Sequence, residues 1–131
     1  MMEVDRTAAW AAEAARAADD KNGVATVVLD VGAVLAITDH FVITSAPNTR
    51  LVRTIAEEVE ARVFSGGGPR PVRTEGLDDL HWVLMDYGTF VVHVFLEETR
   101  RYYELERLWA DVPRMEWRTV QEVAAAREPS R

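Results

Sequence analysis

The sequence predicts a single α/β domain in which helices flank a mixed β-sheet. Two kinds of segment alternate along the chain. Runs rich in β-branched residues are typical of strands, and segments whose apolar residues recur at helical spacing are typical of helices. The chain has 131 residues, the usual size of one domain with one core. We therefore expect one layered domain built from both kinds of element.

The first half of the chain predicts a helix, two strands and a second helix. Residues 3–20 are rich in Ala at helical spacing, and an Asn-Gly pair ends that helix. Residues 24–31 are almost wholly apolar, which favours a strand in the middle of the sheet with both faces buried. Residues 40–45 form the next strand, and Asn48 is the expected cap of the second helix. The apolar positions of that helix are Val52, Ile55, Ala56, Val59 and Val63.

The second half predicts an edge strand, a hairpin and a last helix. A Ser-Gly-Gly-Gly-Pro loop leads to a short edge strand at residues 72–75. Residues 82–87 and 90–96 form an antiparallel hairpin, because the Gly-Thr link between them suits a tight turn. A helix follows at residues 98–111 and stops at Pro113. We therefore divide the chain into a domain at residues 1–112 and a C-terminal extension at 113–131, for which helix and disorder both stay open.

Composition and charge exclude several classes of protein. No apolar run is long enough to cross a bilayer, and the N-terminus lacks a signal-peptide core, so we expect a cytoplasmic protein with no membrane partner. There is no cysteine, which excludes disulfides and thiolate metal sites. The formal net charge of −7 argues against direct, sequence-specific binding of nucleic acid. It suits a basic partner, although it is also the kind of charge that keeps a protein in solution.

Catalytic and metal chemistry find little support in the sequence. Asp30, Asp39 and Asp86 lie near strand ends, where an acid-base or metal pair is conceivable, but no two of them share one strand at alternate positions. Turn and helix capping is the favoured role for these carboxylates. The three histidines fall in different strands or strand flanks. We expect no catalytic residue, no metal and no cofactor.

The hairpin carries more aromatic side chains than a short segment needs for its core. Alternation along a strand puts Trp82 and Asp86 on one face, with Val83 and Met85 on the core face. His93 is either a hydrogen-bonded histidine of the sheet or part of a binding face. Trp, Tyr and Arg dominate the energetics of protein interfaces because they bury large areas and keep polar groups.

The last predicted helix carries two stripes of residues. The apolar stripe, expected in the core, is Leu105, Leu108 and Trp109. The other stripe is Arg100, Tyr103 and Arg107. Taken together with the aromatic residues of the hairpin, this second stripe predicts a partner-binding surface. Its expected members, in contact or in support, are Trp82, Asp86, Tyr87, His93, Arg100 and Tyr103.

Read together, these residues resemble the ribosomal silencing factor family, also called Iojap-related proteins. The resemblance covers roughly residues 10–112 in the right order. Its matching frame is Leu29-Asp30-Val31, Asp39-His40-Phe41-Val42-Ile43, Glu75-Gly76, Trp82-Val83-Leu84-Met85-Asp86-Tyr87-Gly88, His93-Val94-Phe95, Arg100, Tyr103, Leu105-Glu106 and Leu108-Trp109.

The resemblance implies a fold of nucleotidyltransferase-like topology without the catalytic carboxylates, and a translational repressor rather than an enzyme. It implies binding to the large ribosomal subunit through a basic ribosomal protein, the fourteenth of the large-subunit set. The bound factor would block joining with the small subunit by steric exclusion, in starvation or stationary phase. A homodimer is also compatible with the sequence. The alternatives are an adaptor in large-subunit assembly and a degenerate nucleotidyltransferase or small hydrolase that uses the three aspartates named above.

Overall fold

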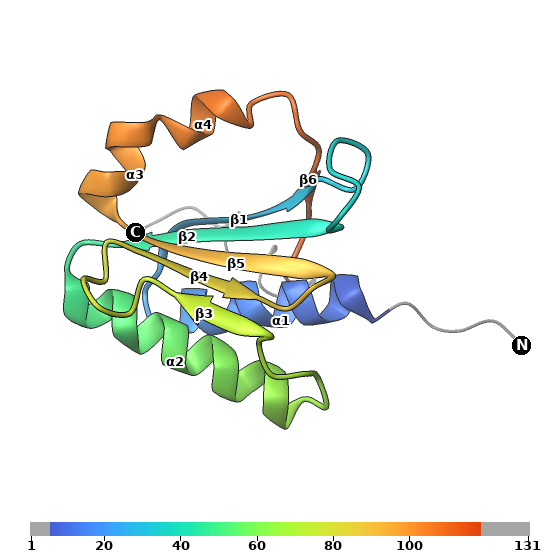
Figure 1. Ribbon diagram of the computed structural model, residues 1–131, viewed down its shortest axis with the longest axis horizontal. Helices are drawn as coiled ribbons and strands as arrows, with labels where there is room; N and C mark the ends of the chain where they lie inside the picture. Colours follow the sequence, from blue (N-terminus) through green and yellow to red (C-terminus); the bar gives the residue numbers. More distant parts are fainter. Residues whose placement is uncertain (1–5, 119–131) are drawn as a thin grey trace, which may run out of the picture.

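The computed structural model describes residues 6–118 and contains one six-stranded sheet with helices on both faces (Figure 1). The helices are α1 (Thr7–Asp20), α2 (Thr49–Ser65), α3 (Glu97–Tyr103) and α4 (Leu105–Leu108). The strands are β1 (Val24–Asp30), β2 (His40–Ala46), β3 (Arg73–Glu75), β4 (Trp82–Asp86), β5 (Phe90–Leu96) and β6 (Arg114–Met115). Among these residues no helix is long and apolar enough to cross a membrane.

The sheet has the order β3-β4-β5-β2-β1-β6 and is mixed. Strands β2 and β5 pair in parallel, and the other neighbours pair antiparallel. The chain between the parallel strands passes through α2, β3 and β4. This architecture confirms the predicted fold class, a single α/β domain with a mixed sheet flanked by helices, and it confirms the β4–β5 hairpin.

Helices α1 and α2 cover one face of the sheet, below it in Figure 1. Inward side chains of β4 and β5, among them Val83, Met85 and Val92, are buried there. Asn48 caps α2 as predicted, its Oδ1 accepting from the Leu51 N–H at 2.8 Å. All five predicted apolar positions of α2 are buried.

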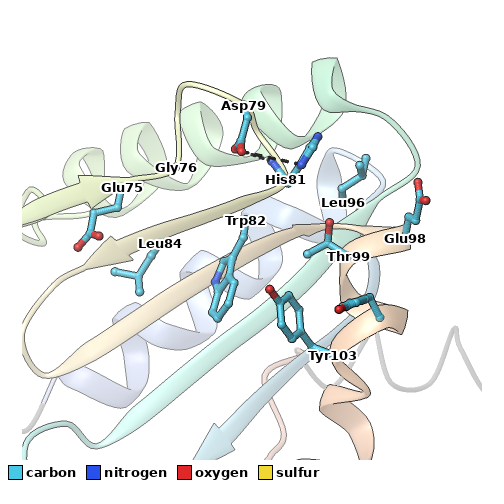
Figure 2. A pocket seen from close by; sticks show the side chains of 11 residues that line it. Glu75, Gly76, Asp79, His81, Trp82, Leu84, Leu96, Glu98, Thr99 and Tyr103 are labelled. Carbon is cyan, nitrogen blue, oxygen red and sulfur yellow. Dashed lines mark hydrogen bonds and ion pairs between the residues drawn. The ribbon is translucent and has the colours of Figure 1, made fainter.

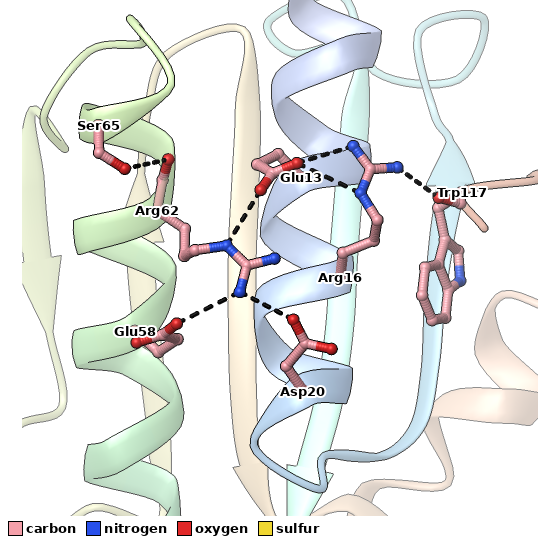
Figure 3. Close-up of polar contacts among 7 residues, drawn as sticks. All are labelled: Glu13, Arg16, Asp20, Glu58, Arg62, Ser65 and Trp117. Atoms are coloured by element: carbon pink, nitrogen blue, oxygen red, sulfur yellow. Dashed lines mark hydrogen bonds and ion pairs between the residues drawn. The ribbon is translucent and has the colours of Figure 1, made fainter. Parts of the chain in front are cut away.

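Charged side chains join the two helices at their outer side (Figure 3). The Arg62 guanidinium of α2 lies 3.0 Å from a Glu13 oxygen and 2.8 Å from an Asp20 oxygen, both on α1. It also reaches Glu58 one helical turn away, at 3.3 Å. The Arg62 guanidinium therefore contacts three carboxylates, and two of these contacts link α2 to α1.

Helices α3 and α4 cover only part of the other face. A smaller apolar cluster there joins Leu29 of β1, Ile43 of β2, Phe95 of β5 and Leu105 of α4. None of its members comes from β3 or β4, so the outer half of this face is left to the groove described below.

Strand β1 is not the central strand that the sequence predicted. It lies between β2 and the two-residue β6, and its Val24 end is exposed. The register shifts between Val24 and Val27, where Ala25 takes a φ of 51°. The bulge turns the first residues of this apolar run away from the core, so a continuous apolar pattern overstated the burial of the strand.

The last predicted helix is in fact two short helices, separated at Glu104, whose φ is 50°. Arg100 and Leu105 are both buried, yet five residues of regular helix would place them about 140° apart. The break allows both side chains to face the sheet. It also leaves Leu108 exposed, contrary to the predicted apolar stripe.

The segment that follows Pro113 belongs to the domain as far as the structure describes it. Strand β6 pairs with Val28 and Leu29 of β1. Trp117 is 3% exposed, and its Nε1–H donates to the Thr26 carbonyl at 3.3 Å. Arg16 of α1 donates to the Trp117 carbonyl at 2.8 Å (Figure 3). Residues 113–118 are therefore neither helix nor a loose extension, and residues 119–131 lie outside the described residues.

Candidate protein-docking surface

A groove of about 750 Å³ lies between the β3–β4 connection and α3 (Figure 2). Its walls combine aromatic, aliphatic and acidic side chains. The lining residues are Glu75, Gly76, Asp79, His81, Trp82, Leu84, Leu96, Glu98, Thr99, Tyr102 and Tyr103.

Trp82 stands at the centre of this groove. Alternation along β4 turns it away from the buried Val83, as predicted, and it is 38% exposed. Its ring centroid lies 4.8 Å from that of Phe95 and 5.7 Å from that of Tyr103. One side of the indole is thus supported by protein, and the other side is available to a partner.

His93 holds the polar end of the indole. The Nε1–H of Trp82 donates to Nδ1 of His93 at 3.1 Å, across the β4–β5 pair. His93 is 8% exposed, and burial lowers its pKa to about 4. The imidazole is therefore neutral near neutral pH, with Nδ1 as the acceptor. His93 therefore supports Trp82 from beneath the surface, and the structure shows the first of the two roles that the sequence left open, a hydrogen-bonded histidine of the sheet.

Two tyrosines form the wall that α3 contributes. Tyr102 and Tyr103 are both exposed, and their rings meet edge to face at 5.0 Å. They end α3 just before the break at Glu104. The break therefore sets where the tyrosine wall stops.

Arg100 lies beneath that wall and is 6% exposed. Its guanidinium donates to the Ser45 Oγ at 3.1 Å and to the Ala25 carbonyl at 3.0 Å. It also donates to the Val24 carbonyl and forms an ion pair with Glu106. All of these partners are internal, so Arg100 fixes α3 on the sheet rather than presenting a cation to a partner.

Asp86 and Tyr87 lie away from the groove. The Asp86 carboxylate accepts from the Gly88 N–H at 2.8 Å and so caps the hairpin turn. Tyr87 is 5% exposed, stacks on Phe90 at 4.5 Å and belongs to the core under α1 and α2. Burial raises the pKa of its phenol. Of the six residues expected from the sequence, Trp82 and Tyr103 line the groove and His93 is hydrogen-bonded to Trp82. Arg100 is buried and holds α3 on the sheet, and Asp86 and Tyr87 do not line the groove.

Sequence reasoning missed the acidic side of the groove. Glu75 and Asp79 come from the β3–β4 connection, and Glu98 comes from the first turn of α3. The sequence does contain the two sides of the groove, namely the acidic loop that includes Gly76 and the paired tyrosines of the last predicted helix. Neither segment specifies that the loop and the helix face each other, since that depends on the order of the strands.

The three aspartates considered for catalysis do not come together. Asp30 and Asp39 lie side by side, since a Cβ built at Gly32 would be 3.7 Å from an Asp30 Oδ1 and 3.3 Å from an Asp39 Oδ1, but Asp86 is remote from both. Asp30 on β1 and Asp86 on β4 are three strands apart, about 14 Å at the usual strand spacing. Asp30 accepts weakly from the Gly32 N–H at 3.4 Å, a turn contact. Within residues 6–118 no three His, Asp or Glu side chains are grouped to hold a metal ion.

Comparison with known proteins identifies relatives along most of the chain. A family model described as "Ribosomal silencing factor during starvation" matches residues 4–131. Ribosomal silencing factor RsfS of Bacillus subtilis is 38% identical over 100 residues, 76% of this chain and 84% of that protein. The solved structure of a Chromobacterium violaceum protein has a TM-score of 0.72 and 29% identity, covering 83% of this chain and 88% of that one.

A mouse protein named mitochondrial assembly of ribosomal large subunit protein 1 is 35% identical over 85 residues, 63% of this chain and 37% of that protein. The family match runs past Pro113, in agreement with the part that β6 and Trp117 play in the fold. The resemblance carried by the sequence motifs is confirmed. This chain belongs to the ribosomal silencing factor family.

Proposed function

We propose that this protein is a translational repressor that binds the large ribosomal subunit by its groove face. Its contact there is a basic ribosomal protein, the fourteenth of the large-subunit set, and the bound factor blocks joining with the small subunit in starvation or stationary phase. The observation that carries the proposal is the half-open Trp82, held by His93 on a part of the sheet that α3 and α4 leave uncovered.

Physical chemistry supports this choice of surface. An aromatic side chain with one face packed and the other open can bury a large area on docking with little loss of its own freedom. The net charge of −7 favours encounter with a basic partner. A compact chain of this length has a radius of gyration of about 14 Å, which is enough to keep two large particles apart without any catalysis. We therefore propose a cytoplasmic binding factor and not an enzyme.

The surface is tested with Trp82→Ala and, as a control, Val72→Ala, an exposed residue that does not line the groove. Cosedimentation with isolated large subunits should show at least about tenfold weaker binding for Trp82→Ala and unchanged binding for Val72→Ala. Far-ultraviolet circular dichroism of both variants should match that of the wild type. Equal binding by the two variants would contradict docking through this groove.

Silencing is tested apart from binding. Purified large and small subunits are mixed with excess protein, and the yield of joined ribosomes is measured on a sucrose gradient. We expect the yield to fall with the wild type and to recover with Trp82→Ala. An undiminished yield at saturating wild type would contradict steric blocking even if the protein stays bound to the large subunit.

The name of the mouse relative favours a second candidate, an adaptor in assembly of the large subunit. That role predicts that precursor particles accumulate when the protein is absent, while translation by mature ribosomes is unaffected. Gradient profiles of a deletion strain in growth and in starvation separate the two roles.

A further inference from the structure

The groove has an unbalanced charge. Three carboxylates line it, those of Glu75, Asp79 and Glu98, and none of its 11 lining residues is Arg or Lys. In Figure 2 they come from opposite sides, with Glu75 and Asp79 beside the β3–β4 connection and Glu98 on α3. A side chain that enters between them therefore meets negative charge on both walls.

The three carboxylates differ in how far they are already paired. Asp79 accepts from the His81 N–H at 3.2 Å and lies 3.9 Å from the His81 ring. Glu75 pairs with Arg73 at 3.1 Å in an exposed contact. Glu98 is exposed, and its carboxylate has no hydrogen bond or ion pair with any residue from 6 to 118. Glu98 is thus the carboxylate with most capacity for an incoming cation.

The remaining walls are aromatic. Trp82, Tyr102 and Tyr103 all line the groove, and aromatic faces attract cations through their quadrupoles. A guanidinium suits such a wall better than an ammonium, because it is planar, more weakly hydrated and able to donate two parallel hydrogen bonds to one carboxylate. The combination of ring faces and a free carboxylate is thus matched to an arginine side chain.

We propose that the groove binds an arginine side chain of the docking protein, with its guanidinium over the Trp82 and Tyr103 rings and paired with Glu98. This inference rests on the proposed function, because it names the group that the partner inserts at the docking surface. It also explains why an exposed tryptophan here lies among acidic residues: the groove favours a basic segment and repels an acidic one.

The groove chemistry is tested on the full chain without ribosomes. The probe is acetyl-Gly-Arg-Gly-amide, and the control is the same peptide with citrulline, which has nearly the shape of arginine and no charge. We expect the arginine peptide to shift the indole Nε1–H resonance of Trp82 saturably, and citrulline to shift it at least about threefold less. Trp82→Phe assigns the resonance. Equal shifts with both peptides would overturn the proposal.

A charge-neutral variant tests the same chemistry on the large subunit. Glu98→Gln should weaken cosedimentation about three- to fivefold and reduce its dependence on salt. The matched control is Glu57→Gln, an exposed carboxylate of α2 on the other side of the sheet.

If Trp82→Ala weakens binding but Glu98→Gln binds like the wild type, the arginine proposal is wrong and the docking surface stands. If the wild type does not cosediment at all, the proposed function fails, and the arginine site is then decided by the peptide titration.

Discussion

Gly76 controls the position of Trp82 through the backbone. Gly76 has a φ of +90°, and a Cβ added there would lie 1.9 Å from the carbonyl oxygen of Trp82. A methyl group at this position must push β4 away from the β3–β4 connection, because the atom that it meets is backbone. We expect Gly76→Ala to lower the free energy of unfolding by about 3 kcal/mol and to weaken docking, as measured by urea denaturation and cosedimentation.

Gly88 provides the matched control. It has a similar φ of +85°, but an added Cβ would meet nothing within 4 Å. Gly88→Ala therefore has only the cost of a left-handed backbone, about 1 kcal/mol. If both variants lose the same stability, backbone conformation alone accounts for Gly76 and the close approach to Trp82 has no energetic weight.

The buried imidazole of His93 makes stability depend on pH. Burial lowers its pKa from 6.5 to about 4, so between these values the unfolded chain binds more protons than the folded chain. The contribution of His93 to the free energy of unfolding is therefore complete above pH 6.5 and is lost as the pH falls through 4. The full loss for this group is about 3 kcal/mol. Denaturation curves at pH 7 and 4.5 should show a smaller difference for His93→Asn, which keeps an acceptor for the Trp82 indole but does not titrate.

Other groups also titrate over this range, so a second histidine serves as reference. His81 is exposed and lies near Asp79, and His81→Asn should show a larger difference in stability between pH 7 and 4.5 than His93→Asn. A pH dependence that is the same in His93→Asn and His81→Asn would show that His93 is accessible to protons in the folded state.

Single residues of β4 and β5 could be placed from the sequence because strand alternation is a local rule. It put Trp82 on the open face and Val83 and Met85 in the core, where the structure has them. Tyr87 alternates with Val83 and Met85 and lies with them in the core, although we expected it at the partner-binding surface because of its residue type. Residue type alone was a weaker guide than position in the strand.

At the scale of elements, the division of the last helix was not predictable from periodicity. Both halves have helical residues, and the break at Glu104 depends on what lies beneath them, namely the internal acceptors of Arg100 and the apolar site of Leu105. The central place assigned to β1 failed for a related reason, because an apolar run does not reveal a bulge or the number of its neighbouring strands. Tertiary contacts therefore determine both the break in the last helix and the position of β1 in the sheet.

The break itself can be tested through its backbone conformation. Glu104 has a φ of 50° and a ψ of 48°, a region that costs a residue with a Cβ about 1 kcal/mol relative to Gly. We expect Glu104→Gly to raise the free energy of unfolding by about 0.5 kcal/mol or more, measured by urea denaturation. Glu104→Ala, which keeps the Cβ, should be nearly neutral, because the Arg107 contact that it removes is exposed. In a continuous helix the order would reverse, since glycine would destabilise by about 1 kcal/mol relative to alanine.

At the scale of the whole molecule, residues 114–118 complete the described fold. Trp117 reaches from the end of β6 into the core between the sheet and α1, and its carbonyl accepts from Arg16 of α1. The sequence set this segment apart because it is polar and follows a helix-ending proline. The buried Trp117 nevertheless holds the segment on the domain, because burying a side chain of this size stabilises the fold by more than the exposed polar neighbours destabilise it.

This view predicts that Trp117 stabilises the entire domain rather than its C-terminal end alone. Trp117→Ala leaves a large cavity in a core shared by α1 and β1, and we expect a loss of about 3 to 5 kcal/mol in one cooperative transition by circular dichroism in urea. Trp117→Phe keeps most of the packing and loses the hydrogen bond to the Thr26 carbonyl, so about 1 to 2 kcal/mol should be lost. Tyr102→Ala, an exposed aromatic of the groove, should change stability by less than about 0.5 kcal/mol. If Trp117→Ala instead unfolds at the same urea concentration as the wild type, the segment is an appendage and the domain ends near residue 112.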